Sequence, residues 1–240
     1  MQNIVWALDN NVNRTTNTRV IGGGWGEITF MDGLTFKTQA GLDIANVRDY
    51  MYWDTESGDG YGYGGLIEEV NSTYATWNWQ NVLNFTRTFN SVHNLTATAV
   101  QEYTHSETEY MDGSVYELSD PFFSEHIISN TFGQKDVGGW KSENGLASYM
   151  FRANYNYDSK YYIGASIRYD GLSKLPKDTR WGTFWGASAA WRLSREKFWT
   201  EAPVNEWFND LRLRASYATI GNSALGSDYP LSLIHISEPT

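Results

Sequence analysis

Residues 148–171 read SYMFRANYNYDSKYYIGASIRYDG, two alternating stretches on either side of a short polar connection. In each stretch most aromatic and apolar residues occupy every second position, and every charged residue lies on the other parity together with Met150 and Tyr162. Because successive side chains of a β-strand point to opposite faces, this period of two predicts two strands with one apolar and one polar face. The sequence thus predicts a hairpin of two long strands joined by a tight turn.

The residues at the ends of the apolar rows distinguish a membrane strand from a strand of a soluble sandwich. Tyr149 and Tyr157 bracket the first row, and Tyr161 and Tyr169 bracket the second, with small or aliphatic residues at the middle of each row. Membrane strands have this order, because their centres face acyl chains and their ends place amphipathic rings at the two interfaces. These four tyrosines are therefore predicted to be membrane-interface anchors.

A third row, from Trp181 to Trp191, has the length that a bilayer requires. At ~3.3 Å per residue and a tilt of about 40°, this row climbs ~25 Å, which is the height of the apolar band of an outer-membrane barrel. Trp181 and Trp191 are predicted to be two further interface anchors.

Charged side chains in these strands keep to the face opposite the aromatic rows. A charge on the lipid face near the midplane costs roughly 2 to 4 kcal/mol, so a bilayer would enforce this segregation. The residues predicted to face a polar lumen are Arg152, Asn154, Arg168, Arg192, Arg212 and Arg214.

The whole chain is predicted to be all-β, an antiparallel transmembrane β-barrel segment of about eight strands with short turns on one side and longer loops on the other. The predicted strands are residues 18–30, 34–46, 73–87, 93–105, 145–157, 160–170, 180–193 and 210–221. The connection 194–209 is long for a turn side, and a short helical turn is expected in it.

Three segments are expected along the chain. Residues 1–17 form a lead-in that lacks the basic flank and apolar core of a signal peptide, which indicates a fragment of a larger gene. Residues 18–230 form a partial outer-membrane barrel domain. Residues 231–240, LSLIHISEPT, resemble translated sequencing-adaptor DNA and are expected to be a non-native tail.

Composition fits this interpretation and excludes other classes. Aromatic residues make up 16% of the 240 residues, yet the mean hydropathy is −0.50, a combination that apolar outer rows and a polar lumen explain. A net charge of −10 argues against a nucleic-acid partner, whose binding surface would be basic. With Cys 0, neither a disulfide framework nor a thiol metal site is expected.

The loop after residue 46 contains two motifs, and each can be interpreted either as a ligand site or as an ordinary loop. Its glycines, Gly60, Gly62 and Gly65, have a dinucleotide-binding spacing, but no strand and helix flank them as that site requires. Its acidic residues, Asp54, Glu56 and Asp59, offer oxygen ligands without the EF-hand order, so a solvated acidic loop is favoured over a calcium site. No cofactor is predicted.

Other polar residues do not indicate an enzyme. The histidines His93, His105 and His126 lack metal-ligand spacing. Pairs such as Glu107 and Glu109 are too common in loops to indicate a glycosidase. The chain is therefore predicted not to be an enzyme.

Aromatic residues in the same loop are candidates for contact with a substrate. Rings at an external mouth can stack on sugar faces, and Tyr52, Trp53, Tyr61 and Tyr63 are the predicted substrate-facing residues. Anchoring at the membrane interface or packing within the loop is the favoured alternative.

Four blocks of sequence carry a resemblance to a known family: GLTFKT at 33–38, DGLSK at 170–174, RWGTFWGASAAWRLS at 180–194 and NDLRLRASYATIGN at 209–222. Their order and spacing resemble SusC/RagA-type TonB-dependent outer-membrane transporters of Bacteroidetes. Leu175-Pro176 and Trp185-Gly186 depart from the pairs usual in that family.

The resemblance implies a parent barrel of about 22 strands with a plugged lumen. It also implies active import of oligosaccharides or peptides, energised by TonB, with a SusD-like surface lipoprotein as partner and membrane lipid around the wall. The family's plug domain and TonB-interacting segment do not match any part of this chain.

Two alternatives stay open. A small eight-stranded outer-membrane anchor or adhesin would pair its first strand with its last. A soluble carbohydrate-binding β-sandwich would bury the rows of residues 161–169 and 181–191 between two sheets.

Overall fold

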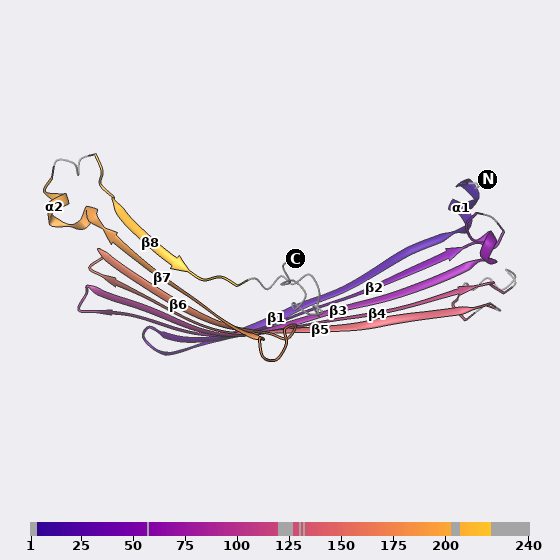
Figure 1. The fold of residues 1–240 in the computed structure, drawn as a ribbon, viewed down its shortest axis with the longest axis horizontal. Coiled ribbons are helices and arrows are strands. Elements are labelled where there is room, and N and C mark those ends of the chain that lie inside the picture. Colours follow the sequence, from indigo (N-terminus) through magenta and orange to yellow (C-terminus); the bar gives the residue numbers. More distant parts are fainter. Residues whose placement is uncertain are drawn as a thin grey trace, which may run out of the picture. The chain divides into compact units, whose positions relative to one another are not determined.

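A computed structural model describes residues 4–56, 58–119, 127–129, 131, 133–202 and 207–221. Its strands lie side by side in chain order in one open antiparallel sheet (Figure 1). They are β1 (Val12–Met31), β2 (Leu34–Trp53), β3 (Leu66–Phe89), β4 (His93–Tyr116), β5 (Lys135–Tyr157), β6 (Tyr161–Leu172), β7 (Trp181–Arg192) and β8 (Arg212–Ala218). The predicted all-β class and order of strands are confirmed.

Helices are short. α1 (Ile4–Asn10) precedes β1, and the 3₁₀ turn η1 (Tyr61–Tyr63) lies between β2 and β3. η2 (Leu193–Arg195) and α2 (Lys197–Thr200) follow β7, where the sequence predicted a short helical turn. None of the helices in the described part of the chain is both long and apolar enough to cross a membrane.

The strands of the first half are longer than predicted. β2 continues to Trp53, β3 begins at Leu66, β4 continues to Tyr116 and β5 begins at Lys135, so much of both predicted long loops is strand. The prediction stopped where the apolar alternation stops, but backbone pairing does not need an apolar face to continue. Tyr52, Trp53, Glu107 and Glu109 therefore lie in strands and not in loops.

Two tight turns have the backbone that their hairpins need. Asn90 and Ser91 between β3 and β4 have φ of 47° and 60°, and Asp158 and Ser159 between β5 and β6 have φ of 49° and 54°. Two consecutive residues with positive φ define a type I′ turn, whose twist matches the twist of the flanking strands. The Lys160 N–H closes the second turn by donating to the carbonyl of Tyr157 at 2.9 Å.

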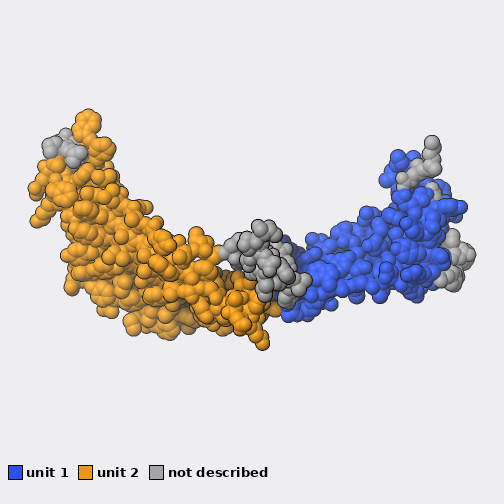
Figure 2. All heavy atoms as spheres, in the orientation of Figure 1, with its two compact units in different colours: residues 1–22, 42–76, 106–143 blue, residues 23–41, 77–105, 144–240 orange. Residues whose placement is uncertain are grey.

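The chain divides into two compact units, coloured separately in Figure 2. Unit 1 comprises residues 1–22, 42–76 and 106–143, and unit 2 comprises residues 23–41, 77–105 and 144–240. The small hydrophobic cluster of unit 1 consists of Tyr52, Ile67 and Val115, with Tyr50, Leu118 and Ile128 packed against it.

Neither alternative architecture agrees with the described residues. The rows of β6 and β7 that a sandwich would bury are exposed, Ile163 by 60% and Trp185 by 50%. The sheet runs from β1 to β8, and over the residues described these two strands do not pair. The closing contact of a small eight-stranded barrel is therefore absent from this part of the chain.

Candidate membrane-facing surface

One face of unit 2 aligns the apolar rows of neighbouring strands. In the β5–β6 register Tyr157 lies opposite Tyr161, and in the β6–β7 register Tyr161 lies opposite Trp191. Directly opposed residues of an antiparallel pair share a face, so the three rings lie side by side. We call this face the belt face. On β5 to β7 it carries Tyr149, Phe151, Ala153, Tyr155, Tyr157, Tyr161, Ile163, Ala165, Ile167, Tyr169, Trp181, Thr183, Trp185, Ala187, Ala189 and Trp191.

Aromatic contacts form one border of the belt face, beside the β5–β6 turn. The ring centroids of Tyr157 and Tyr161 are 6.2 Å apart, and those of Tyr161 and Trp191 are 6.4 Å apart at an interplanar angle of 11°. His93 extends the border onto β4, with its ring 4.9 Å from Tyr157 and its Nδ1 at 2.6 Å from the hydroxyl of Tyr155. The border is thus continuous over four strands.

A second aromatic border lies at the other end of the same rows. Tyr169 stacks on Trp181 at 4.6 Å and 11°, and Tyr149 lies 6.4 Å from the same indole. On β3 and β4, Trp77 and Tyr103 are 5.0 Å apart. The six residues predicted as anchors therefore all belong to these two borders.

At the middle of its rows the belt face is small or aliphatic, whereas Phe151, Tyr155 and Trp185 lie between that middle and the borders. Ala153, Ala165 and Ala187 are aligned across β5, β6 and β7, at the middle of their rows. Small side chains there leave the neighbouring aliphatic and aromatic groups exposed.

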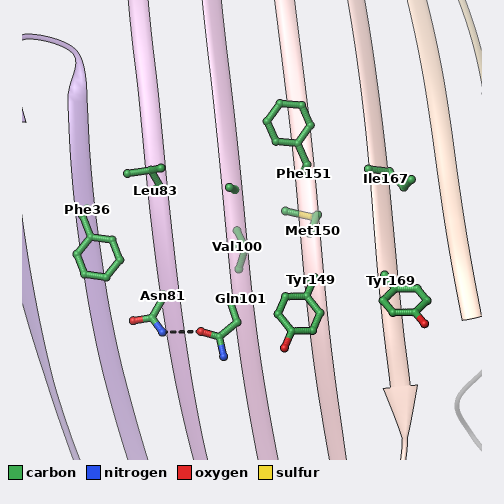
Figure 3. A pocket seen from close by; sticks show the side chains of 11 residues that line it. Phe36, Asn81, Leu83, Val100, Gln101, Tyr149, Met150, Phe151, Ile167 and Tyr169 are labelled. Atoms are coloured by element: carbon green, nitrogen blue, oxygen red, sulfur yellow. Dashed lines mark hydrogen bonds between the residues drawn. The ribbon is translucent and has the colours of Figure 1, made fainter. Parts of the chain in front are cut away.

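A pocket of about 420 Å³ is lined by residues of β2 to β6 (Figure 3). Apolar groups such as Phe36, Leu83 and Ile167 make up most of its lining. At one end Nδ2 of Asn81 donates to Oε1 of Gln101 at 2.7 Å. The pocket therefore presents little polar surface that is not already hydrogen bonded.

The opposite face of the same strands carries the charges. Arg168 donates from Nε to the carboxylate of Asp170 at 2.7 Å and from a terminal nitrogen to Oγ of Ser148 at 3.0 Å. Nε of Arg192 lies 2.9 Å from Oδ1 of Asp210. These ion pairs and hydrogen bonds compensate the charges of Arg168 and Arg192 within the polar face.

The other predicted lumen-facing residues occupy the same face by register. Arg152 lies opposite Ser166, and Asn154 lies opposite Gly164. Arg214 lies opposite Ala190, and the guanidinium of Arg212 lies 4.9 Å from the ring centroid of Tyr162.

A carboxylate that the sequence did not indicate ties the first border to the connection after β7. Glu196 accepts a hydrogen bond from the hydroxyl of Tyr161 at 2.6 Å and one from Nε1 of Trp191 at 3.1 Å. The Tyr161 hydrogen bond, followed by that of Trp191, lowers the pKa of Glu196. The period-two pattern identifies the faces of strands, but it does not identify a hydrogen-bond partner that lies in an irregular segment. A carboxylate five residues after a border tryptophan was the available signal.

The substrate-facing residues predicted in unit 1 have unequal surroundings. Tyr52 is 5% exposed and belongs to the hydrophobic cluster, and Trp53 is half-buried. Tyr61 and Tyr63 are exposed, and the ring of Tyr63 lies 5.6 Å from that of Tyr116. Of the four rings, only these two are available at the surface.

The acidic residues of the same loop are engaged locally. Asp54 accepts a hydrogen bond from Nε1 of Trp6 at 2.9 Å and one from the N–H of Glu56 at 3.1 Å. Across the residues that the structure describes, there is no group of three or more His, Asp or Glu side chains that could hold a metal ion.

Of the histidines considered in the sequence, His105 lies beside an aromatic residue, with its ring centroid 5.8 Å from that of Trp77. His126 and residues 231–240 lie outside the described residues.

No family model matches the chain. Among characterised proteins it is similar to TonB-dependent receptor P39 of Formosa agariphila, with 32% identity over 203 residues, which are 84% of this chain and 19% of that protein. It is also similar to TonB-dependent receptor SusC of Bacteroides thetaiotaomicron, with 33% identity over 95 residues, 40% of this chain and 9% of SusC. The chain spans about a fifth or less of these relatives' lengths.

Solved structures match over almost the whole chain. The RagAB peptide transporter superposes with a TM-score of 0.82 and 24% identity, covering 94% of this chain and 25% of the matched chain. The RagAB peptide importer in its open-open state superposes with a TM-score of 0.80 and 25% identity, covering 92% of this chain and 24% of the matched chain.

Proposed function

Because this chain is homologous to the SusC/RagA type of TonB-dependent receptors over most of its own length, we propose that it forms part of the wall of an outer-membrane transporter. The belt face carries this proposal. Two aromatic borders flank a region whose middle is small and aliphatic across consecutive strands, an arrangement that suits the two interfaces and the acyl region of a bilayer.

The six aromatic anchors then lie at the interfaces, and the polar face of β5 to β8 faces the lumen. The exposure of the belt face supports this orientation, since a surface of this kind in water would be an aggregation hazard. Hydrogen bonds among Arg168, Asp170 and Ser148 support it from the other side, because charges beside water-filled space are retained at little cost.

The transported substrate is an oligosaccharide or a peptide. Transport is energised through TonB and uses a SusD-like lipoprotein at the cell surface, as the similarity to SusC and to RagAB suggests. Tyr61 and Tyr63 are the candidates for substrate contact in this part of the wall, because their rings are exposed.

Uptake by a whole receptor that contains this segment tests the function. We expect cells to accumulate a labelled oligosaccharide or a labelled peptide mixture, and to lose this accumulation when TonB is deleted. Accumulation that does not depend on TonB would contradict the proposal. Comparison of the two labelled mixtures assigns the substrate class.

The division of the chain is proposed together with the function. The partial barrel domain begins with β1 at Val12, inside the predicted lead-in of residues 1–17, and extends to residue 230, and residues 231–240 are a non-native tail. Sequencing of the source gene across this region tests the last assignment, and native codons for LSLIHISEPT would overturn it.

A further inference from the structure

The connection between β7 and β8 exposes three large aromatic side chains. Phe198 is 58% exposed, Trp207 is 85% exposed and Phe208 is 62% exposed. We call these three residues the aromatic patch. A turn that is surrounded by water has no physical need for such groups, and exposed apolar patches usually mark a contact surface.

The patch is held in place by the neighbouring structure. Nε1 of Trp199 donates to the carbonyl of Phe208 at 3.0 Å, which ties residues 207 and 208 to α2. Asp210 accepts hydrogen bonds from Nε of Arg192 at 2.9 Å and from Oγ of Ser194 at 3.1 Å. These bonds order both ends of the connection.

Through Phe198 the patch also contacts the first border of the belt face. The ring of Phe198 meets the ring of Trp191 edge to face, with 6.5 Å between centroids. Glu196, two residues before Phe198, accepts hydrogen bonds from Tyr161 and Trp191. Phe198 therefore prolongs the Tyr157, Tyr161 and Trp191 row away from the strands.

The chemistry around the patch suits the headgroup layer of a bilayer. Aromatic rings favour this layer, where their apolar bodies are buried and polar groups stay hydrated. Arg195, Glu196, Lys197 and Glu201 lie beside the aromatic residues in the sequence, so polar groups that stay hydrated accompany the rings.

We infer that residues 193–202 and 207–211 lie on the membrane surface, with the aromatic patch inserted into the lipid headgroup layer next to the first border. This inference rests on the proposed membrane orientation of the belt face. It explains why a connection on the turn side is long, since a membrane-surface segment needs more residues than a tight turn.

Single-cysteine labelling tests the inference, because the chain has Cys 0 and every introduced thiol is unique. A fluorophore is attached at Phe198→Cys or at Trp207→Cys in the full chain, reconstituted in phosphatidylethanolamine and phosphatidylglycerol vesicles. Quenching is compared between lipids that carry a nitroxide on the headgroup and lipids that carry it deep in the acyl chain. Ala165→Cys at the middle of the belt face and Tyr61→Cys in the β2–β3 loop are the matched controls.

We expect headgroup nitroxides to quench the labels at positions 198 and 207 several-fold more than the label at position 61. Deep nitroxides should quench the label at position 165 most. Labels at 198 and 207 that behave like the label at 61, with the label at 165 still quenched, would overturn the inference alone and point to a protein partner in water. An unquenched label at 165 would overturn the proposed membrane orientation and the inference together.

A second measurement uses no attached fluorophore, so labelling cannot disturb the position of the connection. In vesicles with brominated lipids, Trp207→Phe should remove a quenched component of the intrinsic tryptophan fluorescence. Equal quenching before and after the substitution would count against insertion of this residue.

Discussion

Glu196 connects two strands of the belt face through a single carboxylate. Its Oε1 accepts hydrogen bonds both from the hydroxyl of Tyr161 at the start of β6 and from the indole Nε1 of Trp191 near the end of β7. Hydrogen bonding to the charged form favours that form, which is why the pKa of Glu196 is lowered. Protonation of the Glu196 carboxylate is therefore expected to weaken the hydrogen bonds that hold Tyr161 and Trp191 in the first border.

The pH dependence of stability follows from the sign of this shift. A carboxylate with a lowered folded-state pKa stabilises the fold fully above its unfolded-state pKa, and the pKa of Glu196 is lowered in this way. That stabilisation is lost as the pH falls through the lower folded-state pKa. Glu196→Gln should therefore show a smaller decrease in thermal midpoint on acidification in micelles than the unsubstituted chain.

The matched control for this measurement is Glu201→Gln, which lies on the same connection. It should retain the acid sensitivity of the unsubstituted chain. Parallel pH curves for the unsubstituted chain and Glu196→Gln would show that the carboxylate of Glu196 has no such role.

The tight turn between β5 and β6 places Ser159, which is neither glycine nor asparagine, in a left-handed backbone conformation. Ser159 has φ of 54°, a conformation that β-branched residues adopt only with strain. Ser159→Val should lower the free energy of unfolding by about 1 to 2 kcal/mol, whereas Ser159→Gly should not lower it. Denaturant unfolding in micelles measures both, and equal stability of the two variants would contradict the strain argument.

At the scale of elements, the strand pattern predicts a sharp difference between neighbouring residues of β6. Ala165 lies in the middle of the belt face, and Ser166 lies on the polar face. Ala165→Arg places a charge near the midplane and should cost roughly 2 to 4 kcal/mol of stability in a bilayer, whereas Ser166→Arg should cost much less.

Unfolding from lipid vesicles compares the two variants of β6 directly. They add the same side chain to the same strand, so strand propensity and size are matched. A larger loss for Ser166→Arg would reverse the assigned faces.

The elements also show where pattern stops being informative. β6 and the turn end of β5 were predicted almost to the residue, because their alternation continues to both aromatic borders, whereas the first ten residues of β5, from Lys135, were missed. β2 and β4 were cut short, since Tyr52 and Glu107 lie beyond the apolar alternation and are held in strands by backbone pairing with neighbours.

At the scale of the whole molecule, the described residues bury few apolar side chains and expose many. An open sheet also leaves unpaired backbone groups on β1 and β8, which promote association with other chains. We therefore expect the isolated chain to need detergent or lipid to stay dispersed. Analytical ultracentrifugation checks this, and a monomer stable in plain buffer would contradict the membrane orientation.

The sequence by itself determined the strand class, the order of the strands and the two faces of β5 to β7. These properties are local, because the period of two, the positive-φ turn residues and the spacing of aromatic rings all act between near neighbours. Tertiary structure alone decided which residues meet across strands. It placed Tyr52 in a core, extended β2 to β5 by pairing, and brought Glu196 to Tyr161, because such contacts depend on register and on the path of an irregular connection, which no local pattern specifies.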